Sequence, residues 1–185
     1  MVKKVAFLFP GQGSQAVGMG KDLYDNFEAA KNVFDIADKT LNKSITTICF
    51  EGPEEDLKQT INTQPSIVTT SIAALEALKS ELNITPDFVA GHSLGEYCAM
   101  YTAGVMSLET TLKAIQKRAD LMGATKGGSM AAVLNASEEQ LKAGLEEGSK
   151  VGYVDVANYN SPAQVVITGD DNAVKAASEW LLANG

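Results

Sequence analysis

The pentapeptide Gly-His-Ser-Leu-Gly at residues 91–95 constrains this chain more than any other stretch, because a short apolar run, residues 88–90, leads directly into it. Glycines at both ends permit a sharp turn from strand to helix, which lifts the serine hydroxyl clear of the backbone. Residues 94–104 contain no proline and predict the helix. We therefore expect Ser93 to be a nucleophile at the carboxyl end of a buried strand. An ordinary glycine-rich turn is the alternative.

A serine that attacks a carbonyl needs hydrogen-bond donors for the oxyanion that forms. The first N–H groups of the helix after the turn point toward that position, the backbone N–H of Leu94 above all. The loop after the first apolar run, residues 5–9, offers a second backbone donor at Gln12. An ordinary turn is the alternative for this loop.

The same loop, Gly-Gln-Gly-Ser-Gln-Ala at residues 11–16, partly matches two phosphate-binding motifs. A dinucleotide fingerprint needs an acidic residue that ends a second strand about 20 positions later, but Asp35 and Asp38 lie in a helical pattern. A P-loop needs a lysine where Met19 stands. We therefore expect no nucleotide cofactor at this loop.

Composition excludes several classes of protein. The net charge of -8 opposes nonspecific binding to nucleic acid or to an anionic membrane surface. No segment is apolar enough to span a bilayer, and the run at residues 5–9 ends at Pro10, too early for a signal peptide. The two cysteines, Cys49 and Cys98, are far apart, which argues against a disulfide framework or a metal site. We expect a cytoplasmic protein with two buried thiols.

Periodicity predicts an α/β fold. The apolar run 5–9 indicates a parallel strand covered on both faces and lying beside the strand at 88–90. Between them, apolar residues at helical spacing predict one helix or two with a kink over 23–41, then short helices over 44–51 and 53–61. Pro65 is expected to start a longer helix that ends before Pro86. This order favours a parallel sheet with helical crossovers.

A further helix in this part is expected from an N-cap at Ser107 to about Gly123. Arg118 lies beside its apolar stripe, and Met122 is four residues later on the same face. Arg118 is therefore either a group that projects into the crevice at the strand ends or a solvated surface arginine.

Shorter elements follow the glycine pair at 127–128. They are a strand over 129–134, a helix from a capping box at Ser137 toward Gly148, strands over 151–158 and 164–168 around a turn at 160–162, and a helix over 171–184. This β-α-β-β-α order predicts a ferredoxin-like unit that lacks its last strand. We expect two domains, residues 1–126 and 127–185.

Several motifs occur together and in a fixed order along the chain. They are Phe9-Pro10-Gly11-Gln12-Gly13-Ser14-Gln15 with Gly18-Met19, then Gln64-Pro65, Gly91-His92-Ser93-Leu94-Gly95-Glu96-Tyr97, Arg118 with Met122, and Asn160-Ser161-Pro162 with Gln164-Val165-Val166-Ile167. In this combination the chain resembles the malonyl-CoA:acyl-carrier-protein transacylases of fatty-acid synthesis. The resemblance implies a larger α/β hydrolase-like lobe, with its N-terminal portion at 1–126, and the incomplete ferredoxin-like lobe at 127–185.

The resemblance also implies an activity, the transfer of a malonyl group from coenzyme A to the pantetheine thiol of acyl carrier protein. Ser93 would accept the malonyl group, and the backbone N–H groups of Gln12 and Leu94 would form the oxyanion hole. Arg118 would grip the malonyl carboxylate; His92, which supports the turn, and Met122 complete the substrate-binding group. No metal and no cofactor beyond these substrates are implied, and the partner is acyl carrier protein.

One departure from the family concerns the general base, which is a histidine downstream of the smaller lobe. This chain has a single histidine, His92, whose side chain should diverge from that of Ser93. The chain thus resembles the N-terminal part of the family, and we expect it to be nearly inactive unless a C-terminal segment or another chain supplies the histidine. Two alternatives remain: a catalytically dead or split fragment that binds malonyl-CoA or carrier protein, and a serine thioesterase or esterase that releases free malonate.

Overall fold

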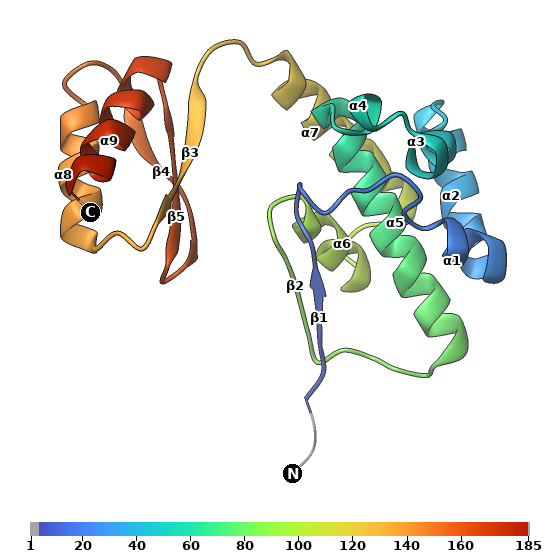
Figure 1. The fold of residues 1–185 in the computed structure, drawn as a ribbon. Helices are drawn as coiled ribbons and strands as arrows, with labels where there is room; N and C mark the ends of the chain where they lie inside the picture. The colour runs from blue at the N-terminus through green and yellow to red at the C-terminus, as the bar shows by residue number, and fades with distance from the viewer. Residues whose placement is uncertain (1–3, 185) are drawn as a thin grey trace. The chain divides into compact units, whose positions relative to one another are not determined.

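The computed structural model describes residues 4–184. The chain divides after Thr125 into two compact units, called here the larger and the smaller unit (Figure 1). The larger unit contains β1 (Ala6–Phe9), α1 (Lys21–Asn26), α2 (Glu28–Leu41), α3 (Ile45–Glu51), α4 (Glu54–Leu57), α5 (Thr60–Glu81), β2 (Phe88–Gly91), α6 (Gly95–Thr102) and α7 (Leu108–Ala124). The smaller unit contains β3 (Ser129–Leu134), α8 (Glu138–Gly148), β4 (Val154–Ser161), β5 (Gln164–Gly169) and α9 (Asp171–Asn184).

The two strands of the larger unit are parallel neighbours, as predicted, with Phe9 opposite Gly91. The prediction that helices cover both faces is wrong for the described residues. Phe7 and Val89 pack against the core, whereas Leu8 and Phe88, on the other face, are 75% and 62% exposed. Side chains alternate along a strand, so helices that pack on one face leave the other face apolar and open.

The helical region after β1 forms two helices, because Phe27 has extended backbone angles between α1 and α2. Of the two predicted arrangements, one helix or two with a kink, the structure has two helices. Tyr24, Phe34 and Phe50 make mutual ring contacts that join α1, α2 and α3. These three rings belong to, or pack against, the hydrophobic core cluster that also includes Ile115 of α7.

Pro65 was predicted to start the long helix, but this prediction is wrong. The helix, α5, begins at Thr60, so Pro65 lies inside it, and the short helix before it ends at Leu57. Proline has no N–H to donate to the carbonyl four residues earlier. That carbonyl, on Ile61, instead accepts hydrogen bonds from Lys43 Nζ at 3.1 Å and from Gln116 Nε2 at 3.3 Å. Side chains from outside the helix thus compensate for the missing backbone bond.

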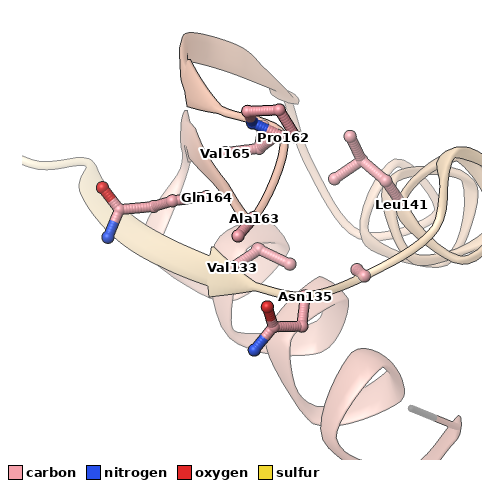
Figure 2. Close-up of a pocket in the computed structure, with 8 residues that line it drawn as sticks. Val133, Asn135, Leu141, Pro162, Ala163, Gln164 and Val165 are labelled. Atoms are coloured by element: carbon pink, nitrogen blue, oxygen red, sulfur yellow. The ribbon is translucent and has the colours of Figure 1, made fainter.

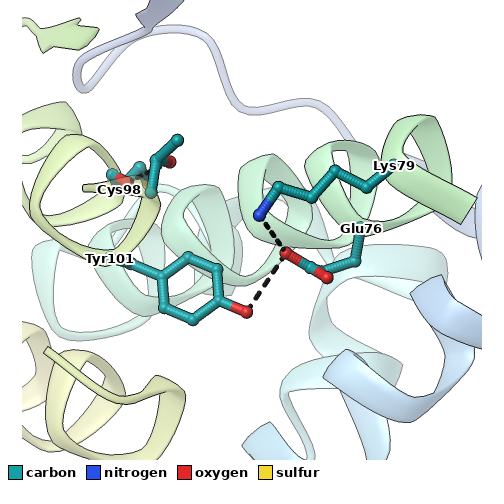
Figure 3. A network of polar contacts seen from close by, with 5 residues as sticks. Glu76, Lys79, Cys98 and Tyr101 are labelled. Carbon is teal, nitrogen blue, oxygen red and sulfur yellow. Dashed lines mark hydrogen bonds and ion pairs between the residues drawn. The ribbon is translucent and has the colours of Figure 1, made fainter. Parts of the chain in front are cut away.

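A polar network joins α5 to α6 (Figure 3). Glu76 Oε1 accepts from the Tyr101 hydroxyl at 3.2 Å and forms an ion pair with Lys79 at 3.0 Å. Burial, together with the nearby Glu76 carboxylate, raises the pKa of Tyr101 to about 12. Burial also raises the pKa of the Cys98 thiol to about 12. Cys49 and Cys98 are both free and buried, as predicted.

The smaller unit has an antiparallel sheet in the order β3-β5-β4. The capping box that begins α8 at Ser137 is present as predicted. Three strand limits differ from prediction, since β4 begins at Val154 and extends through Ser161, and β5 ends at Gly169. Residues 149–152 form a turn after α8, and the Asp170 carboxylate then accepts the N–H of Tyr153, so pairing starts later.

A small cavity in the smaller unit is bordered by β3, α8 and the turn between β4 and β5 (Figure 2). Its lining consists of Val133, Asn135, Ala136, Leu141, Pro162, Ala163, Gln164 and Val165. No titratable side chain is among them, so this cavity carries no acid–base chemistry. Within residues 4–184, none of the helices has both the length and the apolar character that crossing a bilayer requires.

Candidate active site

Ser93 lies on the turn that joins β2 to α6. Its φ of 53° is in the left-handed region, where residues other than glycine are strained. The backbone closes around it, because Gly95 N–H donates to the His92 carbonyl at 2.9 Å and Glu96 N–H donates to the Ser93 carbonyl at 3.2 Å. The strand, sharp turn and helix expected from the pentapeptide are therefore present, and the Ser93 side chain is exposed.

Close backbone packing explains the glycines around Ser93. A Cβ atom on Gly91 would lie 2.0 Å from the carbonyl carbon of Gly95, and one on Gly95 would lie 2.5 Å from the Phe9 carbonyl oxygen. Either contact is shorter than atoms allow. The two glycines let α6 begin directly against the ends of β1 and β2, which fixes the serine at that edge.

The loop after β1 meets the same turn. His92 N–H donates to the Phe9 carbonyl at 3.0 Å. A Cβ atom on Gly11 would lie 2.4 Å from Nδ1 of His92, so the His92 ring packs against this loop. His92 thereby joins the loop after β1 to the turn that carries Ser93.

The two expected oxyanion donors lie on these joined segments. The hydrogen bonds within residues 4–184 do not use the backbone N–H of Gln12 or that of Leu94. The fully buried Leu94 side chain anchors one donor in the core. The Gln12 N–H lies in a loop that is held by two hydrogen bonds. Gly13 N–H donates to Gln15 Oε1 at 2.8 Å, and Ser14 Oγ donates to the Gly11 carbonyl at 2.9 Å. Both N–H groups are thus available to a ligand.

Arg118 reaches Ser93 from α7, which begins at the predicted Ser107 N-cap. Its Nη2 donates to Ser93 Oγ at 2.9 Å, and its Nη1 donates to Gln64 Oε1 at 2.6 Å. The side chain is partly buried, in contrast to the solvated surface arginine that was the alternative. A cation beside a serine hydroxyl suits an acyl group that carries its own negative charge.

Gln64 is a site residue to which sequence reasoning assigned no role. Its side chain is fully buried, and its Nε2 contacts Sδ of Met122 at 3.3 Å. Met122, expected beside Arg118, is therefore joined to it through Gln64, while 47% of Met122 remains exposed. The dipeptide Gln64-Pro65 was the only signal in the sequence, since an amide in a helical run otherwise resembles any polar residue.

Residues 4–184 contain no group of three or more His, Cys, Asp or Glu side chains placed to hold a metal ion. The described residues bring a guanidinium to a serine hydroxyl, and the two backbone N–H groups expected as oxyanion donors lie on the segments that join at the same turn. Such a set is suited to nucleophilic attack on a carbonyl and to binding a carboxylate.

Comparison with known proteins identifies relatives over the whole described chain. A family profile described as "Acyl transferase domain" matches residues 6–185. The malonyl CoA-acyl carrier protein transacylase of Bacillus subtilis strain 168 is 47% identical over 188 residues, which cover 100% of this chain and 59% of that protein. The polyketide biosynthesis malonyl CoA-acyl carrier protein transacylase PksC of the same strain is 44% identical and is matched over 94% of this chain and 59% of its own length.

Solved structures give the same result. The crystal structure of malonyl CoA-acyl carrier protein transacylase from Clostridium perfringens superposes with a TM-score of 0.92 at 41% identity, covering 99% of this chain and 58% of that one. A type II polyketide acyl-carrier protein in complex with its malonyl-transacylase also matches, with a TM-score of 0.92 at 34% identity over 99% of this chain and 60% of that one. The chain is therefore an α/β protein that spans about three fifths of the length of these relatives.

Proposed function

The chain belongs to the acyl transferase domain family, and from that premise we propose that it carries the nucleophile and the carboxylate-binding arginine of a malonyl-CoA:acyl-carrier-protein transacylase. The reaction moves a malonyl group from the coenzyme A thioester to the pantetheine thiol of acyl carrier protein, for fatty-acid or polyketide synthesis. The names of the relatives support the substrate and the partner. No cofactor or metal takes part in this proposal.

Ser93 Oγ attacks the thioester carbonyl carbon, and the resulting oxyanion accepts hydrogen bonds from the N–H groups of Gln12 and Leu94. The C–S bond then breaks, coenzyme A leaves as its thiol, and a malonyl-serine ester remains. The pantetheine thiol attacks this ester through the same oxyanion site and releases Ser93. The Ser93 proton needs a base that passes it to the leaving coenzyme A sulfur and later returns the pantetheine thiol proton to Ser93. Because the His92 ring packs on Gly11, we propose a histidine outside these 185 residues for this role.

The 2.9 Å contact between Arg118 Nη2 and Ser93 Oγ is the observation that carries the choice of substrate. In a malonyl ester the carboxylate carbon is two bonds from the carbonyl carbon, within reach of a guanidinium that touches the nucleophile. The planar guanidinium can donate two parallel hydrogen bonds to that carboxylate. An acetyl group has no carboxylate and leaves those donors unpaired.

The finer fold assignment is also a proposal. We infer that the larger unit is the N-terminal portion of a hydrolase-like lobe and that the smaller unit is a ferredoxin-like lobe without its last strand. The parallel β1–β2 pair and the β3-β5-β4 order support these assignments. The two free, buried cysteines fit a cytoplasmic protein.

Product analysis tests the activity. The chain is joined to a C-terminal segment that carries a histidine and is incubated with malonyl-CoA and pantetheine-bearing carrier protein. We expect malonyl-carrier protein as the product. Free malonate as the main product would instead identify a thioesterase, and binding of malonyl-CoA without turnover would identify a dead binding module.

A further inference from the structure

We propose that Gln64 is a positioning residue that sets acyl selectivity, because it fixes the Arg118 guanidinium beside Ser93 without cancelling its charge. This inference rests on the proposed function, in which Arg118 binds the malonyl carboxylate. It adds a second residue, on a different helix, to the selection of a charged acyl group.

The orientation of the Gln64 amide follows from its two neighbours. Arg118 Nη1, at 2.6 Å, has only donors, so it must face the amide oxygen. The Met122 thioether, 3.3 Å from Nε2, is only an acceptor and must face the amide nitrogen. Both ends of a fully buried amide are thus satisfied, and a rotation of the amide by 180° would break both contacts.

Gln64 is itself held in place by the helix that carries it. Pro65 leaves the Ile61 carbonyl without its helical partner, and Gln116 on α7 donates to that carbonyl at 3.3 Å. The start of α5 is therefore bonded to α7 through Ile61 as well as through Gln64. A side chain anchored in this way holds Arg118 in one position rather than following its motion.

The charge of this partner decides what Arg118 can bind. Within residues 4–184, Arg118 takes part in none of the ion pairs. Its buried partner is a neutral amide, which orients the guanidinium and leaves its positive charge for a ligand. A carboxylate at position 64 would accept the same hydrogen bond but would also neutralise Arg118.

The test compares the affinities for malonyl-CoA and acetyl-CoA by calorimetric titration of the 185-residue chain. We expect Gln64→Glu to reduce the preference for malonyl-CoA by about tenfold or more, with acetyl-CoA affinity little changed, because a charged hydrogen bond is lost from only one ligand. The matched control is Gln59→Glu, the same substitution at the exposed boundary of α5, which should keep the wild-type preference.

A neutral variant, Gln64→Met, separates positioning from general structure. It keeps the length of the side chain but removes the hydrogen-bond acceptor, so we expect a smaller loss of preference than for Gln64→Glu, again from weaker malonyl-CoA binding. If thermal melting shows that the glutamate variant is unfolded, Gln64→Met alone tests the inference. If Gln64 had a purely structural role, its loss would weaken the binding of both ligands equally and leave the ratio of the two affinities unchanged. That result would overturn this inference but not the proposed function. A wild-type chain without preference would overturn the role of Arg118 in the proposed function as well.

Discussion

Replacing Ser93 by glycine should give a more stable protein than replacing it by alanine, the reverse of the usual order. Ser93 has a φ of 53°, and a residue with a side chain loses about 1–2 kcal/mol in this region. Glycine avoids that cost but loses roughly 0.5–1 kcal/mol more conformational entropy on folding. Both variants lose the Arg118–Ser93 hydrogen bond, so this loss cancels between them. We expect Ser93→Gly to exceed Ser93→Ala by about 0.5–1 kcal/mol.

Urea unfolding followed by circular dichroism measures this difference. The matched control is Ser80, an exposed residue in the last turn of α5 with its own side-chain hydrogen bond to the Ala77 carbonyl. At Ser80, alanine should be more stable than glycine, by at most about 1 kcal/mol, because helical angles favour alanine. Trp180, the single tryptophan, lies in α9 of the smaller unit. We expect its fluorescence to show the same urea midpoint in both Ser93 variants. Equal or greater stability of Ser93→Ala would refute strain at the turn.

Three further predictions follow from the site. In the chain extended by a histidine-bearing segment, Arg118→Ala should shift the ratio of specificity constants toward acetyl thioesters by about 1.5–3 kcal/mol, the usual contribution of a hydrogen bond to a charged group, and an unchanged ratio would return Arg118 to the role of a surface charge. Gly95→Ala should lower the free energy of unfolding by about 1–3 kcal/mol, because its Cβ would lie 2.5 Å from the Phe9 carbonyl oxygen, and a normal melting temperature would contradict this packing. Without a histidine-bearing segment, the 185-residue chain should transfer malonyl groups more slowly than the extended chain by on the order of a millionfold. Light scattering should show that it self-associates through the exposed Leu8 and Phe88. A monodisperse chain with the rate of the extended protein would reveal a base within these residues.

Much of the fold was predictable because local patterns agreed with the tertiary structure. The turn at Ser93, the caps at Ser107 and Ser137, and the helix over 171–184 each have a local physical cause, so their signals survive folding. Pro65 misled the prediction for a nonlocal reason. Lys43 and Gln116, both outside the helix, donate hydrogen bonds to the Ile61 carbonyl that the proline leaves without a helical donor, and a local rule does not take such residues into account.

The candidate site was predictable where spacing or a turn marks a residue and not where only contacts do. Ser93 is marked by its glycines, and Arg118 by its place beside an apolar stripe. Gln64 acquires its role only because α5 and α7 cross, which brings it to 2.6 Å from Arg118 across 54 positions of sequence. The open face with Leu8 and Phe88 was missed because an apolar run does not reveal which of its sides is covered.

Covalent labelling shows whether Ser93 carries the malonyl group. The chain, extended by a histidine-bearing C-terminal segment, is incubated with malonyl-CoA, and the mass of the intact protein and of its peptides is measured. We predict one malonyl group on the peptide that contains Ser93 and none in the Ser93→Ala variant. A label that persists in Ser93→Ala, or that maps to another peptide, would show that Ser93 is not the residue that accepts the malonyl group.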